Sequence, residues 1–405
     1  MPLSLLNSIV GPVMRGPSSS HAAAPFFIGT CCRQLSCGFG EKLYQATIIF
    51  DPTGTFAPVY QNQGSDQGFA AGLSGIAMTD KNYRDILPAC LAGENFQLTF
   101  EVAALEQMTH PNRVDLFLQM KETDGTNRTD HYKAISTGGG MFEIFELNGT
   151  PLLICGDTAL ILVKGDIQHS ALPVEGQLIL AEKDGYHQII APKTSDVELL
   201  REWKHHSHLE EIRFCQATQY SAATPLPPLT STEVVLTLSQ EHGDLAKAAL
   251  WYEANLLEIS IDEAKSYFLD RAARMLQSVE EGLSSQNDNQ RMKYMPATAS
   301  KVHQANLPPS LGGELLQTAI AGAIAVMERN AVRGIVAAAP TAGSAGIVPG
   351  CLYGLKKVGF SEDELADALA VMALIGTVYG ERATFAAECG GCQVETGAAA
   401  AMAAG

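Results

Sequence analysis

The sequence has few basic residues for its length. Lysine and arginine together number 27, against 44 aspartates and glutamates, which gives a formal net charge of −17. Such a chain has no basic field to gather a phosphate backbone, because nucleic-acid affinity depends on clustered cations. We therefore expect no nucleic-acid partner, and we expect chemistry on a small molecule.

The sequence also lacks a long uninterrupted apolar run. The opening stretch MPLSLLNSIVGPVMRG has no basic region followed by a long apolar core, so it does not indicate a secretory signal. The most apolar later stretch, residues 318–349, contains Glu328, Arg329 and Arg333. Charges at such positions are costly inside a bilayer. We expect no membrane partner and a cytoplasmic location.

A dense, evenly counted cysteine framework is absent too. The nine cysteines are an odd number spread over a long chain, which predicts reduced thiols rather than disulfides. Six of them lie in apolar or strand-like contexts and are expected to act as small buried hydrophobes. These six are Cys31, Cys32, Cys37, Cys90, Cys155 and Cys215.

Cys389 and Cys392 differ from the other cysteines. The segment ECGGCQ places both thiols among glycines, where the backbone can approach a metal or cluster closely. A C-x-x-C pair also fits a redox couple or two packed thiols. These three interpretations stay open on the residues alone.

The organisation of the chain predicts several units. A length of 405 residues suggests two or three separate cores. Residues 1–149 carry alternating runs such as RVDLFLQMKE, which predict an antiparallel sheet with helices. Residues 150–218 predict a small α+β module, and the proline-containing residues 219–231 predict a linker. Residues 232–405 are helical in composition. The predicted fold class is therefore an α+β N-terminal domain followed by an all-α domain.

Helix starts are marked in the C-terminal part. Ser260 and Ser361 each precede a glutamate by three residues, which is the spacing of a capping box. We expect helices to begin at both positions.

Residues 18–21, three serines and His21, form a serine loop after Pro17 and before a helical run. Hydroxyls next to the free amides of a helix start suit a carboxylate ligand. An ordinary serine cap with a surface histidine explains the same residues equally well.

Three further motifs carry candidate chemistry. His110, followed by Pro111, is placed for proton transfer near neutral pH, although a simple turn has the same pattern. The triple glycine of residues 138–140 suits an anion-binding turn or a tight bulge. Residues 341–344 join two apolar helices through small and hydroxyl residues, which predicts either a pocket wall or a close helix crossing.

Six segments together resemble a known family. They are GPSSSHAAAP, GSDQGFAAGLSGI, HPNRVDLFL, STGGGMFEIFELNG, AVMERNAVRGIVAAAPTAGSAGIVPG and ECGGCQVETGAAAAMAAG. In order and spacing they resemble the iron–sulfur-dependent L-serine dehydratases in their single-chain form. The resemblance spans nearly the whole chain.

The resemblance implies a fold and an activity. The N-terminal domain would be related to the allosteric substrate-binding domain of phosphoglycerate dehydrogenase, and residues 150–218 would stand in the place of a degenerate ACT domain. The helical domain would be catalytic and would hold a [4Fe–4S] cluster. The implied reaction is deamination of L-serine to pyruvate and ammonia, in which iron assists departure of the β-hydroxyl.

The resemblance also implies site residues. Cys392, in the Gly-Cys-Gln motif, looks like a cluster ligand, and Cys389 is a weaker candidate. The expected catalytic residues are His110, Ser18, Ser19, Ser20 and His21. The expected substrate-binding residues are Asn112, Asp66, Gly138, Gly139, Gly140, Thr341, Gly343 and Ser344. L-serine or a similar molecule is the expected partner, and a homodimer is left open.

Two departures from the family pattern bear on activity. Residues 61–63 read Gln-Asn-Gln where the family carries histidines, and amides do not exchange protons usefully. The family's other two cluster cysteines lie beyond the Gly-Cys-Gln helix, and the sequence ends at Gly405. We therefore expect an incomplete ligand set and no turnover from these residues alone.

Alternative functions stay open at this stage. One is a dehydratase for another small β-hydroxy amino acid, and a second is a catalytically silent amino-acid-binding homologue. The triple glycine also faintly suggests a pyridoxal-phosphate enzyme, but no lysine stands in a convincing Schiff-base context.

Overall fold

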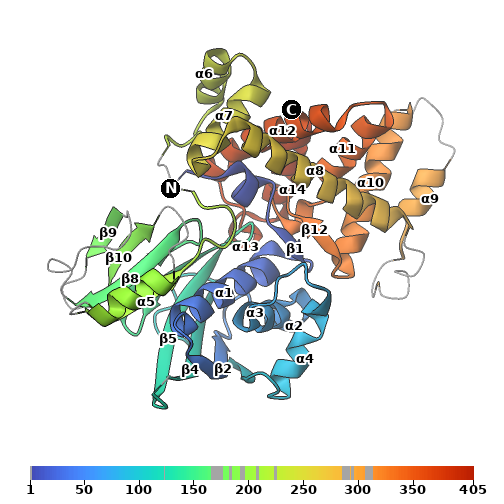
Figure 1. Cartoon of the computed structure of the whole chain (residues 1–405). Helices are drawn as coiled ribbons and strands as arrows, with labels where there is room; N and C mark the ends of the chain where they lie inside the picture. The colour runs from blue at the N-terminus through green and yellow to red at the C-terminus, as the bar shows by residue number, and fades with distance from the viewer. Residues whose placement is uncertain are drawn as a thin grey trace. The chain divides into compact units, whose positions relative to one another are not determined.

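The computed structural model describes residues 2–122, 124–165, 177–181, 185–191, 197–206, 209–222, 226–284, 292, 296–305 and 313–405. The chain divides into two compact units (Figure 1). The sheet unit comprises His21–Thr137 and Met141–Ala223, and the helical unit comprises Met1–Ser20, Gly138–Gly140 and Thr224–Gly405. Among the described helices, none is long and apolar enough to cross a membrane.

A six-stranded sheet forms the larger part of the sheet unit, in the order β3-β2-β4-β5-β6-β7. The pairing of β2 with β4, of β4 with β5 and of β6 with β7 is antiparallel. The expectation of a wholly antiparallel sheet is wrong at one edge, because β3 runs parallel to β2. The helices between these two strands carry the chain back to the end where β2 started. The strands are β2 (Lys42–Phe50), β3 (Gln97–Val102), β4 (Arg113–Lys121), β5 (Asn127–Gly138), β6 (Met141–Leu147) and β7 (Thr150–Ile154).

Two helices of this unit, α1 (Ala24–Cys37) and α3 (Ser65–Ser74), lie side by side (Figure 1). A Cβ on Gly68 would lie 2.5 Å from the carbonyl oxygen of Ala22, and one on Gly72 would lie 2.2 Å from that of Phe26. The two glycines therefore let the helix backbones touch. The shorter helices are α2 (Tyr60–Gln63), the 3-10 turn η3 (Lys81–Arg84) and α4 (Ile86–Leu91).

A second, four-stranded sheet has the order β11-β8-β10-β9, with antiparallel neighbours throughout. Its core includes Ile161, Ile189, Leu200 and Trp203. Because β7 belongs to the larger sheet, the small module's own sheet starts after the predicted boundary at residue 150. Residues 166–176 of the predicted ACT-like module lie outside the described residues. The elements are β8 (Ala159–Gly165), β9 (Gln177–Ala181), β10 (His187–Ala191), α5 (Val197–His206) and β11 (Leu209–Cys215).

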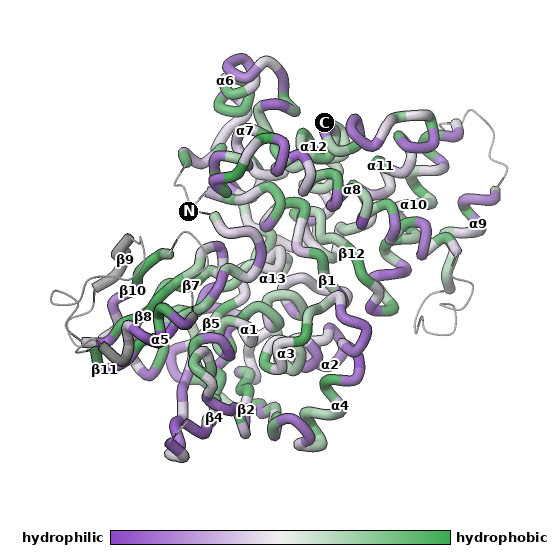
Figure 2. Tube along the Cα trace, viewed as in Figure 1, coloured by the Kyte–Doolittle hydropathy of each residue, from purple (hydrophilic) through white to green (hydrophobic). Residues whose placement is uncertain are grey.

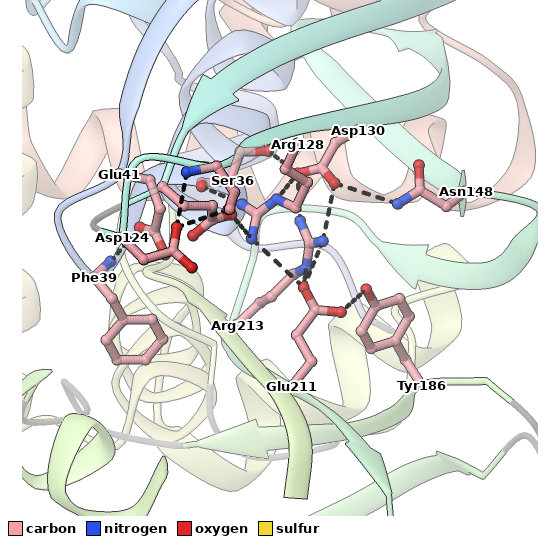
Figure 3. A network of polar contacts seen from close by, with 12 residues as sticks. Ser36, Phe39, Glu41, Asp124, Arg128, Asp130, Asn148, Tyr186, Glu211 and Arg213 are labelled. Atoms are coloured by element: carbon pink, nitrogen blue, oxygen red, sulfur yellow. Dashed lines mark hydrogen bonds and ion pairs between the residues drawn. The ribbon is translucent and has the colours of Figure 1, made fainter. Parts of the chain in front are cut away.

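A buried ionic network joins the two sheets within the sheet unit (Figure 3). Arg213 on β11 donates to Oδ2 of Asp130 on β5 at 2.5 Å, and Ser36 on α1 donates to the same oxygen at 2.7 Å. Burial opposes ionisation of Asp130, but the hydrogen bond and charge of Arg213, with Arg128 and Ser36, hold its pKa below the usual range. The network therefore fixes β11 against β5 and α1.

The buried cysteines of the sheet unit behave as packed side chains. Cys31, Cys32, Cys90 and Cys215 are buried, as predicted, whereas Cys37 and Cys155 are partly exposed. Desolvation raises the pKa of Cys37 to about 11. A thiol with such a pKa is a poor nucleophile at neutral pH.

The helical unit packs its longest helices closely. Glycines permit the approach of α10 (Gly313–Ala331) to α11 (Ile347–Lys357), since a Cβ on Gly350 would lie 2.5 Å from the carbonyl oxygen of Ala319. The predicted helix starts at residues 260 and 361 are both present. Ser361 and Glu364 form a complete capping box, whereas at Ser260 only the serine half is formed. The remaining helices are α6 (Thr232–His242), α7 (Leu245–Leu257), α8 (Ile261–Ser284), α9 (Ala299–Gln304), α12 (Glu362–Arg382), α13 (Ala387–Gly390) and α14 (Cys392–Ala403).

Residues 2–20 belong to the helical unit, although the sequence analysis grouped them with the N-terminal sheet. They form the π-helical turn η1 (Leu5–Ile9) and the strand β1 (Val13–Arg15). β1 pairs antiparallel with β12 (Ile335–Ala337), beside which the N-terminal segment runs in Figure 1. Hydrophobic burial explains this placement, because Leu5, Leu6 and Ile9 are fully buried. Residues 223–225 of the predicted linker lie outside the described residues.

Candidate functional site

Ser19, Ser20 and His21 of the serine loop lie on a π-helical turn, η2 (Ser19–Ala23), that runs directly into α1. The cap position of α1 is Ala23, and no side chain caps it. No serine side chain therefore caps α1 itself, and a cap by a serine at the start of η2 stays a prediction. Ser19 and Ser20 are instead buried in the helical unit, where each meets a group far away in the sequence.

Ser19 and Ser20 contact two different segments of the helical unit. Ser19 Oγ accepts a hydrogen bond from the backbone N–H of Ala342 at 3.3 Å. Ser20 Oγ donates to Oε1 of Glu388 on α13 at 3.0 Å. Ser18 Oγ lies 3.5 Å from Ser20 Oγ. The loop thus presents hydroxyls beside a carboxylate.

The turn of residues 341–344 brings a second carboxylate into this region. Thr341 Oγ1 donates to Oε1 of Glu395, on the first turn of α14, at 2.5 Å. Thr341 Oγ1 also lies 3.3 Å from Ser344 Oγ. A Cβ on Gly343 would lie 2.9 Å from the same carboxylate oxygen. Gly343 therefore provides the space that Glu395 occupies.

Burial raises the pKa of Glu395, because desolvation penalises the charged carboxylate. The hydrogen bond from Thr341 acts in the opposite direction, and the charge of Glu388 adds to the increase. Two carboxylates that influence each other in a partly buried place can hold a proton between them or attract a cation. We call Ser19, Ser20, Thr341, Glu388 and Glu395 the hydroxyl–carboxylate site.

The triple glycine forms the hairpin tip between β5 and β6, and the helical unit includes it. Its φ angles are 101°, 65° and 95° at Gly138, Gly139 and Gly140. These angles favour glycine. A Cβ on Gly138 would lie only 2.3 Å from the backbone nitrogen of Ala386. The glycines thus serve a close backbone approach two residues before Glu388, and anion binding by this turn stays a prediction.

Asn330 on α10 lies beside the same turn. Its Nδ2 donates to the carbonyl oxygens of Ala342 at 2.9 Å and Pro17 at 3.4 Å. Both partners are acceptors, so the orientation of the amide is fixed. Within the part of the chain that the structure describes, Oδ1 of Asn330 has no hydrogen-bond partner, although the residue is buried.

The two cysteines of the ECGGCQ segment follow Glu388. Cys389 is exposed on α13. Cys392 is the first residue of α14, and its side chain lies outside the described part of the structure. Among the described residues, no three His, Cys, Asp or Glu side chains are arranged to hold a metal ion. The described side chains do not by themselves form a cluster site, so the ligand roles of Cys392 and Cys389 stay predictions.

In the sheet unit, His21 and Asn112 share Thr55. His21 Nε2 lies 3.1 Å from Thr55 Oγ1, and Thr55 Oγ1 donates to Oδ1 of Asn112. Asn112 Nδ2 donates to the carbonyl oxygen of Ser136 at 3.2 Å. Because the threonine proton is used by Asn112, His21 donates through Nε2. This chain of contacts orients His21, whose ring also packs against Phe56 at 4.7 Å.

His110 and Asp66 are held by local contacts. The backbone N–H of Asn112 donates to Nδ1 of His110 at 3.1 Å. His110 therefore takes part in a local turn, which is one of the two interpretations of this motif. Oδ1 of Asp66 accepts from the backbone N–H of Gln67 at 2.7 Å in the first turn of α3. Residues 61–63 lie on the short helix α2, whose residues are strongly hydrophilic (Figure 2).

The expected site residues therefore divide between the units. The sheet unit contains four of them: His21, Asp66, His110 and Asn112. The helical unit contains the others: Ser18, Ser19, Ser20, Gly138, Gly139, Gly140, Thr341, Gly343 and Ser344. Sequence reasoning missed Glu388, Glu395 and Asn330. The two glutamates flank the C-x-x-C motif in the sequence, so a search for paired carboxylates near that motif was the available signal.

Comparison with known proteins identifies the family. The family described as "Serine dehydratase alpha chain" matches residues 187–405, which is more than half of the chain. The probable L-serine dehydratase beta chain of Bacillus subtilis is 32% identical over 38% of this chain and 65% of its own length. The probable L-serine dehydratase alpha chain of the same organism is 41% identical over 24% of this chain and 32% of its own length.

A Streptomyces coelicolor protein named L-serine dehydratase is 32% identical over 44% of this chain and 40% of its own length. The match spans less than two thirds of the length of each of these three relatives. The family match covers α6 to α14 and with them Thr341, Glu388 and Glu395 of the hydroxyl–carboxylate site. The chain belongs to the serine dehydratase alpha chain family.

Proposed function

We propose that the protein containing this chain is an L-serine ammonia-lyase, which converts L-serine to pyruvate and ammonia. The hydroxyl–carboxylate site carries this proposal, since it combines buried hydroxyls with two interacting carboxylates, and both carboxylates lie in the region that matches the family. The named relatives that are L-serine dehydratases support the choice of substrate.

L-serine presents an ammonium, a carboxylate and a β-hydroxyl. The negative charge of Glu388 suits the ammonium, because an opposite charge in a partly buried site is strongly favoured. The Ser20 hydroxyl donates to Glu388, and its oxygen lone pairs can accept a hydrogen bond from the ammonium or the β-hydroxyl of the substrate. The unused acceptor Oδ1 of Asn330 lies next to this turn and adds a second group for an ammonium proton.

The reaction requires loss of the α-proton and departure of the β-hydroxyl as water. The resulting enamine tautomerises to an imine, and water then releases ammonia and pyruvate. Glu395 is suited to hold or pass a proton, because burial favours its protonated form more than is usual for a glutamate. In this role it acts from the first turn of α14, with Thr341 fixing its orientation.

The iron–sulfur cluster remains a prediction from the sequence resemblance. A cluster of this kind would supply a Lewis acid for the departing hydroxyl. The described side chains do not by themselves provide its ligand set. We also propose a cytoplasmic location, and that residues 150–218 form a degenerate ACT-like module.

The function is tested by two measurements. Pyruvate and ammonia released from L-serine are assayed on the protein in its natural full length, with iron and sulfide supplied anaerobically. Binding of L-serine to this chain is measured by calorimetry. Equal amounts of both products support the proposal. Binding without product release favours the silent amino-acid-binding homologue, and absence of binding and turnover contradicts both.

Ser20→Ala is the informative variant. We expect it to lower kcat/KM for L-serine by roughly ten-fold or more, because a hydrogen bond to a charged group contributes about 1.5–3 kcal/mol. Ser266→Ala is the matched control, since Ser266 is an exposed serine on α8 of the same unit. Equal kinetics for the two variants would exclude Ser20 from the reaction.

A further inference from the structure

A pocket lies between α6, α7 and the residues that precede α6 in the helical unit. Its volume is about 390 Å³, which falls in the range of about 300–1,000 Å³ that is usual for small-molecule sites. α6 and α7 lie side by side (Figure 1), and neither helix contains a residue of the hydroxyl–carboxylate site. The pocket is therefore separate from the site proposed for L-serine.

Most of the residues that line the pocket are apolar or aromatic. Leu229 and Tyr252 are buried, whereas Leu238 and Trp251 are half-buried and leave part of their surface to the pocket. The ring of His242 stacks on Trp251 with centroids 4.2 Å apart, and the hydroxyl of Tyr252 donates to a backbone carbonyl at 3.1 Å. Both aromatic rings are thus held in place. Such walls suit a ligand with a hydrocarbon body.

Two carboxylates give the pocket a negative charge. Glu233 and Glu241 both line it from α6, and Thr237 lies between them in the sequence. These three residues share one face of the helix, because residues four positions apart are neighbours on a helix surface. None of the described residues that line the pocket is basic. The pocket therefore suits a cation.

The ends of α6 act differently on the two carboxylates. Glu241 lies in the last turn, where the partial negative charge of the helix end disfavours a further anion. Among the described residues, none forms an ion pair with Glu241. A bound cation would relieve this repulsion. At the first turn, a hydrogen bond from Ser231 lowers the pKa of Glu233, and the charge of Arg382 acts in the same direction.

The spacing of the two carboxylates indicates the length of the cation. Glu233 and Glu241 are eight positions apart, and a rise of about 1.5 Å per residue puts their Cα atoms about 12 Å apart along the helix. A hydrogen bond from an ammonium to a carboxylate takes about 3 Å at each end. About 6 Å then remains between two ligand nitrogens, which a chain of about four or five methylenes spans.

We propose that this pocket binds an aliphatic diamine, whose two ammonium groups pair with Glu233 and Glu241 and whose methylene chain lies against Leu238 and Trp251. An ammonium near the indole ring gains a further cation–π attraction. L-serine does not suit the pocket, because the two glutamates repel its carboxylate and it has no hydrocarbon chain. The proposal does not rest on the proposed function, since the two sites share no residue.

The test is calorimetric titration of the chain with cadaverine at about 0.15 M salt, where weak attraction to surface charges is screened. We expect saturable binding of one cadaverine per chain. Tryptophan fluorescence gives a second readout. Of the two tryptophans, Trp203 lies in the core of the small sheet, so a change on titration reports on Trp251.

Two other ligands test the need for a second ammonium. Pentylamine keeps the hydrocarbon chain and one ammonium, and we expect its Kd to be about 3- to 10-fold higher than that of cadaverine, because one charged hydrogen bond in a partly exposed place is lost. Pentanediol has no charge and is expected not to bind. Equal affinity for cadaverine and pentylamine would overturn the proposal, because only one carboxylate would then take part.

Substitutions test the two carboxylates directly. Glu233→Gln and Glu241→Gln are each expected to raise the Kd for cadaverine by about 3- to 10-fold. Glu314→Gln is the matched control, because Glu314 is an exposed glutamate on α10 that does not line the pocket. We expect it to change the Kd by less than about two-fold.

Val234→Lys places an ammonium of the protein itself beside the two carboxylates. Val234 lines the pocket and its side chain is already 39% exposed, so the variant should fold, which circular dichroism checks. We expect it to lose cadaverine binding. Two results would overturn the proposal: absence of cadaverine binding by the folded wild-type chain, or wild-type affinity in both Glu233→Gln and Glu241→Gln.

Discussion

Thr341 donates a hydrogen bond of 2.5 Å from Oγ1 to Oε1 of Glu395. Thr341 is fully buried, and Glu395 lies on the first turn of α14, three residues after Cys392. The bond therefore connects the turn before α11 to the helix that begins with the Gly-Cys-Gln motif. It also partly offsets the desolvation that raises the pKa of Glu395.

Thr341→Val removes the hydroxyl and keeps the shape of the side chain. We expect the free energy of unfolding to fall by about 1–3 kcal/mol, because a partly buried carboxylate loses a hydrogen bond. Denaturant unfolding measures the change. Thr377→Val is the control, since the hydroxyl of Thr377 bonds only to the carbonyl of Ala373 in its own helix. An equal loss in both variants would show that the hydrogen bond to Glu395 contributes no more to stability than a hydrogen bond within a helix.

Ser20 and Glu388 should be coupled in ligand binding. A double-mutant cycle with Ser20→Ala and Glu388→Gln, read by calorimetry with L-serine, is expected to give an interaction energy of about 0.5–3 kcal/mol, because the two side chains are hydrogen-bonded. The same cycle between Ser20→Ala and Glu233→Gln is the control, as Glu233 is exposed on α6. Additive effects in the first cycle would show that the two residues act independently.

Substitutions of two glycines can separate the stability lost through backbone strain from the stability lost through a steric clash. Gly138 and Gly149 both have positive φ, at 101° and 82°, but only Gly138 has close neighbours. Gly149→Ala should cost the strain alone, about 1–2 kcal/mol. Gly138→Ala should cost clearly more, because its Cβ would lie 2.3 Å from the nitrogen of Ala386. Thermal unfolding of the two variants checks the difference, and equal losses would contradict close packing at Gly138.

The contact between Asp130 and Arg213 should make the stability of the protein sensitive to acid. Its pKa is lower when folded than when unfolded, so the Asp130–Arg213 pair adds stability above the unfolded pKa of about 3.9. That stability is lost as the pH falls through the folded value. Unfolding measured between neutral pH and strongly acidic pH should therefore show the wild type losing stability in acid, and Asp130→Asn should remove this component of the loss.

At neutral pH, Asp130→Asn should itself cost about 1–3 kcal/mol, because Arg213 keeps Glu211 as an ion-pair partner but loses its hydrogen bonds to a buried carboxylate. Glu146→Gln is the control, since the Glu146–Lys133 pair on neighbouring strands is partly exposed. Surface pairs of this kind contribute about 0–1 kcal/mol. A similar cost for both substitutions would show that the buried network contributes no more to the free energy of unfolding than a surface ion pair.

Local signals in the sequence predicted several elements. The run RVDLFLQMKE predicted β4, because period-two alternation reports directly on a half-buried strand. The capping box at Ser361 marked the start of α12, since its two hydrogen bonds involve only residues three positions apart. Such features depend on neighbours in the sequence.

Features that depend on distant residues were not predicted. The parallel pairing of β2 with β3 follows from the helices between them, and alternation carries no information on strand direction. Glu253 looks like an ordinary helical glutamate in the sequence, and only the fold shows that it accepts a hydrogen bond from Ser4. Glu388 and Glu395 became candidates because folding places them beside Ser20 and Thr341.

The proposed function is tested most directly by calorimetric titration of this chain with L-serine, because binding at the hydroxyl–carboxylate site does not require turnover. We predict saturable binding of one L-serine per chain, weakened by roughly ten-fold or more in Ser20→Ala and unchanged in Ser266→Ala. Absence of binding by the folded wild-type chain, or equal affinity in Ser20→Ala, would contradict the assignment of this site to L-serine.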